Sequence, residues 1–274
     1  MGRVDKAVIM ARGLGTRMRR QDESAALNDD QGTAADSGVK AMIPIGDGRP
    51  FLEYVLSALA DAGYTRACLV IGPEHGNVRE YFGVQMPPRG IRVEFAIQEK
   101  PLGTADAVAA ARQFAGNDRF LLINSDNYYP VRALEDISGL DGAGVALFDR
   151  DRMVMDGNIP EDRVRNFSVA EVGRDGCLRR IHEKPSDEIL RAMGVPLWVN
   201  MNCWLFSPAI FEACGRIDLS ARGELELTAA VQYAIDIMGE RFTALQFREA
   251  VLDLSSRSDI MPVVDKLRTL NPEP

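Results

Sequence analysis

Residues 8–17, Val-Ile-Met-Ala-Arg-Gly-Leu-Gly-Thr-Arg, decide the fold of this chain. A short apolar run, typical of a buried strand, leads into two glycines and then an arginine. The backbone N–H groups of such a turn are free to face a phosphate, and the guanidinium of Arg17 can bind phosphate oxygens as well. We therefore predict a strand followed by a phosphate-binding turn, which we call the glycine loop (residues 11–17).

The glycine loop matches neither of two common phosphate-binding motifs. The dinucleotide fingerprint needs Gly-x-Gly-x-x-Gly, but Met18 stands where the third glycine is required. The Walker A motif needs Gly-Lys-Ser/Thr, and the chain contains no Gly-Lys pair. The sequence also lacks a strand-end acidic residue about 20 positions further on, outside a polar segment, which argues against a nicotinamide-dependent oxidoreductase.

Apolar runs and amphipathic segments alternate through the first half of the chain. The predicted strands there are 8–10, 67–71, 93–97 and 120–124, and the predicted helices are 51–63, 78–82 and 104–115. This order predicts an α/β fold with a mostly parallel sheet flanked by helices. The second half is more mixed, with predicted strands at 144–148, 167–172, 178–182, 199–207, 242–247 and 251–254, and predicted helices at 208–215 and 224–238.

Residues 19–38 stand apart as a polar segment without a helical apolar stripe. A loop of this length inside a compact domain is usually functional. Because the segment lies between the glycine loop and Lys40, we interpret it as a mobile active-site flap. The alternative is a tolerated surface insertion.

The bulk composition restricts the class of protein. A chain of 274 residues, of which 46% are hydrophobic, can form one large domain. The formal net charge of −8 argues against a nucleic-acid-binding surface, because such surfaces are usually basic. No apolar run reaches the length of a membrane span, and the first residues lack an apolar signal core. We therefore expect a cytoplasmic protein with small-molecule partners, and no nucleic acid or membrane partner.

Cysteine and histidine offer little chemistry in this sequence. None of the four cysteines has Cys-x-x-Cys spacing, and Cys68 and Cys203 lie in apolar runs, which predicts buried, unreactive thiols. Two histidines, His75 and His182, are too few for a histidine-rich zinc site. We expect structural roles for both, with His75 exposed in a turn.

A series of short motifs resembles the sugar-1-phosphate nucleotidylyltransferases, also called NDP-sugar pyrophosphorylases. The glycine loop is similar to the family's Ala-Ala-Gly-x-Gly-Thr-Arg, and residues 39–44 are similar to its Pro-Lys-Pro stretch. The further matches are residues 48–54, 98–105, 124–127, 183–185, 199–200 and 223–228. Together these motifs cover nearly the whole chain in the family's order.

The resemblance implies both a fold and a reaction. The fold is a Rossmann-like, mostly parallel mixed sheet flanked by helices, with a smaller mixed β lobe for the sugar. We expect a single domain, residues 1–274, whose nucleotide-binding lobe is 1–130 and whose sugar-phosphate-binding lobe is 131–274. The reaction makes an NDP-sugar and pyrophosphate from a nucleoside triphosphate and a sugar 1-phosphate, by in-line attack on the α-phosphate with Mg²⁺.

The resemblance also implies roles for individual residues. The catalytic residues are Arg17 at the leaving pyrophosphate, Lys40 near the α-phosphate, and Asp126. Asp126 and Asp253 are the implied ligands of Mg²⁺, which prefers carboxylate oxygens. The implied nucleotide-binding residues are Ala11, Arg12, Gly13, Gly15, Thr16, Gln98, Gly103 and Thr104. The implied sugar-phosphate-binding residues are Glu183, Lys184, Asn200 and Glu226, with Glu224 as an alternative to Glu226.

Departures from the family pattern leave several alternatives open. Arg12 replaces a small residue beside the nucleobase, where its side chain can face the base or form a salt bridge. Asp253 lies in residues 251–257, which keep only part of the family's Trp-x-Asp-x-Gly-Thr-Pro stretch. The acceptor could instead be a cyclitol or amino-alcohol phosphate, or the chain could be a non-catalytic nucleotide-sugar sensor. The base, the sugar and a homo-oligomeric state stay open.

Overall fold

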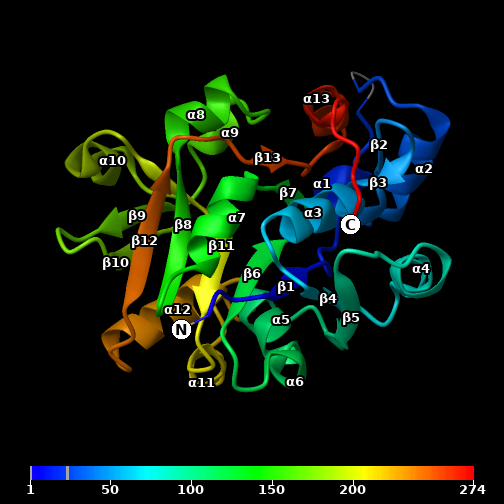
Figure 1. Cartoon of the computed structure of the whole chain (residues 1–274). Helices are drawn as coiled ribbons and strands as arrows, with labels where there is room; N and C mark the ends of the chain where they lie inside the picture. Colours follow the sequence, from blue (N-terminus) through cyan, green and yellow to red (C-terminus); the bar gives the residue numbers. More distant parts are fainter. Residues whose placement is uncertain (1, 23–24) are drawn as a thin grey trace.

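The computed structural model describes residues 2–22 and 25–274. Within these residues, nine strands form one mixed sheet, and helices cover both of its faces (Figure 1). The strand order along the main path is β10-β9-β11-β6-β1-β4-β5, and β8 lies between β11 and β12. This arrangement confirms the predicted α/β fold class.

The first half of the chain builds a parallel sheet. Its strands are β1 (Lys6–Met10), β4 (Arg66–Ile71), β5 (Arg92–Ile97) and β6 (Phe120–Asn124). β1 is parallel to both β4 and β6, and β4 is parallel to β5. Their carboxyl ends therefore lie at one edge of the sheet, where open α/β sheets usually bind ligands.

The second half extends the same sheet with mostly antiparallel strands. They are β8 (Ala143–Asp149), β9 (Val169–Val172), β10 (Leu178–His182), β11 (Trp198–Phe206) and β12 (Phe242–Phe247). β11 joins the halves, because it pairs antiparallel with β6, β8 and β9. β12 is parallel to β8, and β9 and β10 form an antiparallel hairpin.

Strand side chains enter a separate hydrophobic core on each face of the sheet. On one face, Ile9 and Ile123 pack with α3 (Phe51–Asp61), α7 (Val131–Ser138) and α13 (Ile260–Leu267). The alternation of strand side chains sends neighbouring residues to the opposite face.

The second core holds Val8 and Leu122 on that opposite face. They pack with α5 (Thr104–Ala110), α11 (Ile210–Cys214) and α12 (Leu227–Asp236). Burial on both faces explains why the parallel strands read as continuous apolar runs in the sequence.

The remaining elements are short and mostly connect the sheet to its edge. They are α1 (Thr16–Arg19), α2 (Asp29–Ser37), η1 (Lys40–Met42), β2 (Pro44–Ile45), β3 (Arg49–Pro50), α4 (Gly76–Glu80), η2 (Tyr81–Gln85), α6 (Arg112–Ala115), β7 (Asn127–Tyr128), α8 (Arg150–Met155), α9 (Glu161–Val164), α10 (Asp187–Met193), β13 (Leu252–Asp253) and η3 (Arg257–Asp259). The predicted helix over 104–115 is interrupted at Ala111, and the one over 224–238 begins at Leu227. Among the described residues, none of the helices combines the length and the apolar character that crossing a bilayer requires.

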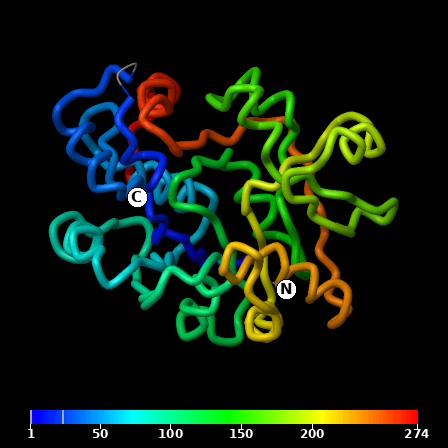
Figure 2. Tube along the Cα trace, turned by 180° about the vertical axis from the view of Figure 1, so that it is seen from behind, coloured from blue at the N-terminus to red at the C-terminus, as the bar shows by residue number. Residues whose placement is uncertain are grey.

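After β12 the chain crosses back to the first half, as the orange-to-red segment in Figure 2 shows. There β13 pairs antiparallel with β7, so that Asp253 lies opposite Asn127. The C-terminal end stays on this side, where the Glu273 N–H donates to Ser57 Oγ at 3.1 Å. This crossing brings residues far apart in the sequence to the carboxyl end of β6.

The structure corrects the prediction that residues 19–38 form a loop. Residues 29–37 form α2, and residues 23–24 of the segment lie outside the described residues. The helix begins with a capping box, in which Asn28 Oδ1 accepts from the Gln31 N–H at 2.8 Å and Gln31 Oε1 accepts from the Asn28 N–H at 3.2 Å. It ends at Gly38, whose φ is +75°. Caps rather than an apolar stripe specify this helix, so the periodicity could not reveal it.

The prediction that His75 is exposed is also wrong. Its side chain is buried, and Nδ1 accepts a hydrogen bond from the Gly72 N–H at 3.3 Å. Burial lowers the pKa of His75. The predicted burial of Cys68 and Cys203 is confirmed, and burial raises the pKa of the Cys68 thiol to about 12.

Candidate active site

Two adjoining pockets open at the carboxyl edge of the parallel strands. One, which we call the loop pocket, has a volume of about 410 Å³ and is lined by residues of the glycine loop, of η1 and of the region that begins α5. The other, which we call the polar pocket, has a volume of about 320 Å³ and is lined mainly by the second half of the chain. Both volumes suit small molecules. The residues that line both pockets are Thr104, Asn124, Asp126, Asn202 and Glu224.

The loop pocket contains most of the implied nucleotide-binding residues. These are Ala11, Arg12, Gly13, Gln98, Gly103 and Thr104, together with Lys40. Gln98 Nε2 donates to the Gly103 carbonyl at 3.0 Å and to Asp106 Oδ2 at 2.8 Å. Gly103 has φ +118°, and a Cβ there would lie 2.5 Å from the Leu225 carbonyl oxygen. The glycine is therefore required by the backbone of Leu225, whatever else it contacts.

Arg12 forms a salt bridge, which was one of the two alternatives for this residue. Its Nε lies 3.3 Å from Glu74 Oε1, and its Nη2 lies 3.4 Å from Glu74 Oε2. The Arg12 side chain is 7% exposed, so the protein covers most of the guanidinium. The salt bridge of Arg12 thus connects the glycine loop to the turn at residues 72–76.

The end of the glycine loop packs against residues 37–38 rather than lining the loop pocket. Gly15 has φ +61°, and a Cβ there would lie 2.1 Å from the Gly38 carbonyl oxygen. Arg19 Nη2 donates to the Ser37 carbonyl at 2.7 Å. Thr16 begins α1, and Arg17 points to the polar pocket, where its Nη2 lies 3.4 Å from Ser255 Oγ.

Asp126 lies where the two pockets meet, and Lys40 binds it. Lys40 Nζ donates to Asp126 Oδ2 at 2.7 Å, and both side chains are mostly buried. The turn that carries Asp126 is held by two backbone bonds. Ser125 N–H donates to the Met10 carbonyl, and Leu254 N–H donates to the Asp126 carbonyl. The carboxylate is therefore anchored to β1 and to the segment that contains Asp253.

Asp253 reaches the same pocket from β13. Its Oδ1 accepts from Asn127 Nδ2 at 2.9 Å and from Ser255 Oγ at 3.0 Å. Its Oδ2 is buried without a hydrogen bond, although Arg163 Nη2 lies 3.2 Å away. Burial and the negative charge of Asp126 raise the pKa of Asp253 to about 6. The two implied metal ligands thus lie together rather than on different faces.

The donor atoms of Asp126 and Asp253 fit a hard divalent cation. Both carboxylates line the polar pocket, each repels the other, and Asp253 presents an oxygen that no protein hydrogen bond uses. A bound cation would offset the repulsion and use that oxygen. Within the described ranges, no cluster of three or more histidine, cysteine or acidic side chains is placed to hold a metal. Mg²⁺ typically takes one or two carboxylates plus phosphate oxygens, so two are sufficient.

The polar pocket contains three of the four implied sugar-phosphate-binding residues. Glu183, Asn200 and Glu226 line it, whereas Lys184 does not. Lys184 is exposed beside Glu183 and has φ +44°, an unusual conformation for a residue before proline. Partial burial raises the pKa of Glu183, and the charge of Glu226 adds to this increase.

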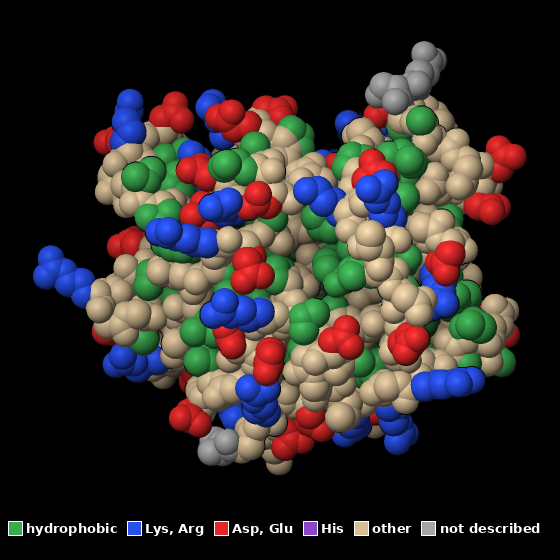
Figure 3. Space-filling model, turned by 45° about the horizontal axis from the view of Figure 1, so that its top comes forward, with side chains coloured by type: hydrophobic (Ala, Val, Ile, Leu, Met, Phe, Trp, Pro, Cys, Tyr) green, Lys and Arg blue, Asp and Glu red, His purple; other side chains and the backbone are tan. Residues whose placement is uncertain are grey.

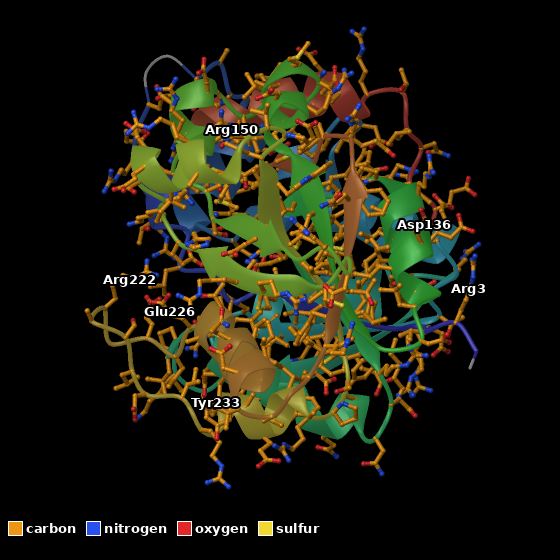
Figure 4. The ribbon with its side chains drawn as sticks, turned by 90° about the vertical axis from the view of Figure 1, so that its left-hand side faces the viewer. Arg3, Asp136, Arg150, Arg222, Glu226 and Tyr233 are labelled. Atoms are coloured by element: carbon orange, nitrogen blue, oxygen red, sulfur yellow. The ribbon has the colours of Figure 1, made fainter. Side chains whose placement is uncertain are left out.

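Arg222 and Glu226 form the outer rim of the polar pocket. They lie side by side just before α12 (Figure 4), and Arg222 Nη2 donates to Glu226 Oε1 at 3.0 Å. Burial raises the pKa of Glu226, but hydrogen bonds from Ser220 and Arg222 outweigh it, so the net shift is downward. Over the face shown in Figure 3, basic and acidic side chains are interspersed.

Sequence reasoning missed several residues of the site, among them Arg163 and Asn202. Arg163 binds Asp259 through Nη1 at 2.8 Å and lies against Asp253, although nothing near it in the sequence suggests such a role. Asn202 lines both pockets with φ +56°, and its position two residues after Asn200 on a strand was the available signal.

A profile of the family described as nucleotidyl transferase matches residues 35–267, most of the chain. The chain belongs to this family. Its curated relatives place it with the sugar-1-phosphate nucleotidylyltransferases, as its motifs predicted.

Two curated relatives illustrate the match. A glucose-1-phosphate thymidylyltransferase of Streptomyces griseus is 34% identical over 233 residues, which are 84% of this chain and 57% of the relative. The low-salt glycan biosynthesis nucleotidyltransferase Agl11 of Haloferax volcanii is 27% identical over 241 residues, which are 84% of this chain and 59% of the relative. The chain thus spans little more than half the length of these relatives.

Solved structures share the fold. The UTP-bound UGPase from Acinetobacter baumannii has a TM-score of 0.70 and 18% sequence identity, over 98% of this chain and 95% of that one. A UDP-glucose pyrophosphorylase complexed with UDP-glucose has a TM-score of 0.69 and 18% identity, over 97% and 99% of the two chains.

Proposed function

We propose that this chain transfers a nucleotidyl group from a nucleoside triphosphate to a sugar 1-phosphate. A phosphate oxygen of the acceptor forms a bond to the α-phosphorus while the bond from that phosphorus to the bridging β-phosphate oxygen breaks. The products are an NDP-sugar and pyrophosphate. The name of the curated relative from Streptomyces griseus, a glucose-1-phosphate thymidylyltransferase, supports this class of reaction.

The observation that carries the proposal is the position of Asp126 on the wall shared by the two pockets. A reaction between two phosphorylated substrates needs one place where both phosphates meet. The loop pocket, with the glycine loop and Lys40, suits the triphosphate, and the polar pocket suits the acceptor. The shared wall is therefore where bond exchange would occur, and positioning of reactants there supplies much of the rate.

The basic residues would neutralise the charge that shifts during the reaction. Lys40, beside Asp126, offers a compact positive charge to the α-phosphate. Arg17 lines the polar pocket and not the loop pocket, so its planar fork would meet the leaving pyrophosphate only where the two pockets join. Asp126 and Asp253 would hold Mg²⁺, which supplies charge neutralisation to phosphate oxygens when bound. Mutating one such donor commonly costs about 100-fold to 1000-fold in rate.

The polar pocket would recognise the sugar through its hydroxyl groups. Glu183 and Glu226 can accept hydrogen bonds, and Asn200 can donate and accept. Lys184, exposed at the rim, would reach the sugar phosphate only after its side chain turned inward. Mg²⁺, the nucleotide and a homo-oligomeric assembly all remain predictions.

Pyrophosphate release tests the proposal directly. Purified protein is given each of UTP, dTTP, CTP, ATP and GTP with a panel of sugar 1-phosphates, inositol 1-phosphate and phosphocholine, and Mg²⁺. We expect turnover with at least one sugar 1-phosphate, reduced about 100-fold or more in Asp126→Asn and Arg17→Ala. The matched controls are Asp136→Asn and Arg132→Ala, an exposed ion pair on α7 outside both pockets.

Each other outcome selects a different function. Turnover with inositol 1-phosphate or phosphocholine but with no sugar 1-phosphate would assign the chain to the other acceptor class. Nucleotide binding by calorimetry without any turnover would support the non-catalytic sensor. Full activity in Asp126→Asn and Arg17→Ala would overturn the assignment of the site.

A further inference from the structure

β11 contains a bulge where it passes the two pockets. Its pairing with β8 shifts register between Asn200 and Cys203, and Asn202 within the bulge has φ +56°. A left-handed backbone favours glycine, and asparagine is one of the few other residues that adopt it readily. The bulge therefore has a side chain, that of Asn202, at a position where the backbone conformation alone would favour glycine.

Internal bonds fix the orientation of both asparagine side chains in the bulge. Asn200 Oδ1 accepts from the Asn202 N–H at 3.0 Å. Asn202 Oδ1 accepts from Trp204 Nε1 at 3.3 Å, and an indole nitrogen can only donate. Each amide oxygen is thus in use, so each amide NH₂ group is directed away from these contacts.

Among the described asparagines that line the polar pocket, Asn200 and Asn202 are the two whose amide NH₂ groups donate no hydrogen bond to protein. Three other asparagines line it, and each donates to protein: Asn124 to Asn127 Oδ1, Asn127 to Asp253 Oδ1, and Asn166 to the Asp162 carbonyl. In the described part of the chain, neither Nδ2 of Asn200 nor Nδ2 of Asn202 donates to a protein atom. Asn202 differs from Asn200 in lining the loop pocket as well.

The charges of the polar pocket explain why a neutral donor is needed there. Its ionisable lining consists of two basic residues, Arg17 and Arg222, and five acidic ones, Asp126, Glu183, Glu224, Glu226 and Asp253. Arg222 is already paired with Glu226. Asp126 and Asp253 are the proposed metal ligands, so Glu183, Glu224 and Glu226 remain as negative charges near an entering phosphate. Neutral N–H donors would therefore add to the binding of that phosphate.

We infer that Asn202 binds the phosphate group of the acceptor through Nδ2, at the wall where the two pockets meet. Trp204 orients this amide by holding its oxygen. The inference rests on the proposed transfer reaction and adds to it a specificity-determining residue for phosphorylated acceptors.

Two substitutions separate this role from a structural one. Asn202→Gly keeps the left-handed backbone and removes the amide, but it leaves the buried indole N–H of Trp204 without a partner. Trp204→Phe removes that donor, so Asn202→Gly is also made in the Trp204→Phe protein and compared with Trp204→Phe alone. Asn202→Asp keeps an acceptor for Trp204 and replaces the donor with a carboxylate.

Steady-state pyrophosphate release is measured against both substrates for each protein. In the Trp204→Phe background, Asn202→Gly should lower kcat/KM for the acceptor about 10-fold to 100-fold, the range for a hydrogen bond to a charged group. The KM for the nucleoside triphosphate, and its binding measured by calorimetry, should change less than threefold. Asn202→Asp should lower kcat/KM for the acceptor further, because its charge repels the phosphate.

Three results would overturn the inference. The first is equal acceptor kcat/KM with and without Asn202→Gly in the Trp204→Phe background, which would leave the amide only a role in satisfying the indole. The second is an effect confined to the KM of the triphosphate. The third is a wild-type protein without turnover on any acceptor, which would reject the proposed function and the inference together, whereas the first two results leave the function standing.

Discussion

Substitution of Gly15 by alanine should disrupt the glycine loop more than its conformation alone would predict. Gly15 has φ +61° and ψ 24°, a left-handed conformation that costs an alanine about 1–2 kcal/mol. The new Cβ would also lie 2.1 Å from the Gly38 carbonyl oxygen and 2.6 Å from its Cα. Real contacts are never this short, so the loop or residues 37–38 must move, at a further cost of about 1–3 kcal/mol. We expect a total loss of about 2–5 kcal/mol.

Gly176→Ala is the matched control for this prediction. Gly176 has φ +73° in the hairpin between β9 and β10, and a Cβ there meets nothing within 4 Å. It should lose only about 1–2 kcal/mol. Urea unfolding followed by circular dichroism gives both values. Because Arg17 follows Gly15 on α1, pyrophosphate release should fall in Gly15→Ala and persist in Gly176→Ala. Equal losses of stability in the two variants, within 0.5 kcal/mol, would refute the close approach of Gly15 to Gly38.

Three further predictions concern the charges and caps of the site. First, the pKa of Asp253 is raised to about 6 in the folded protein, above the ordinary value of about 4 for an aspartate. The folded state therefore binds this proton more tightly than the unfolded state does. The stabilisation that results is complete below about pH 4 and is lost as the pH rises through 6. Metal-free Asp253→Asn should therefore gain about 2–3 kcal/mol relative to wild type between pH 4 and pH 8 in urea unfolding, and a pH-independent difference would contradict the buried carboxylate. Second, Asn28→Ala removes one partner of the capping box of α2 and should cost about 1 kcal/mol, whereas Asn271→Ala, near the exposed C-terminal end, should cost less than half of that. Third, removal of divalent cations with EDTA should abolish pyrophosphate release and addition of Mg²⁺ should restore it; activity that persists in EDTA would reject the metal site.

The sequence predicted the positions of the longer strands well because buried strands leave apolar runs in the sequence. Residues 8–10 and 120–123 are continuous apolar runs, and their side chains divide between the two cores of the sheet. The motif residues at strand ends followed from the same reasoning, since carboxyl ends of parallel strands meet at one edge. The alternation of strands and helices therefore predicted the sheet. The position of the motif residues at strand ends predicted that their side chains lie together at one edge of it.

The errors arose where short-range contacts replace periodicity. α2 is specified by a capping box at its start and a glycine at its end. The helix buries few apolar side chains, so its sequence has no apolar stripe that would predict it. His75 is buried, with a hydrogen bond from the Gly72 N–H and with Glu74 Oε1 4.0 Å from its Nε2. The turn-like residues around it do not reveal this burial. Such contacts depend on the positions of loops that are distant in the sequence, and local sequence patterns do not predict those positions.

The same limit applies to the partners of Asp253. The resemblance implied that Asp253 and Asp126 share a metal ion, but it implied neither the pairing of Asp253 with β7 nor the approach of Arg163 from α9. Arg163 also binds Asp259, so one guanidinium connects two carboxylates across a turn of the chain. Its position beside Asp253 means that the metal-free carboxylate already has a nearby positive charge.

Residues 251–257 keep only part of the family pattern, and the turn that they begin connects the site to neighbouring helices. Asp259 Oδ2 accepts from the N–H groups of Ser255 and Ser256, which fixes the turn after Asp253. Arg257 is buried, and its Nε donates to the Met18 carbonyl at 3.0 Å while Nη2 pairs with Asp36 of α2. This one side chain thus connects the turn after Asp253 to α1 and α2. A substitution such as Arg257→Lys, which keeps the charge but cannot make both contacts, would loosen α1, and with it Arg17, without touching either pocket.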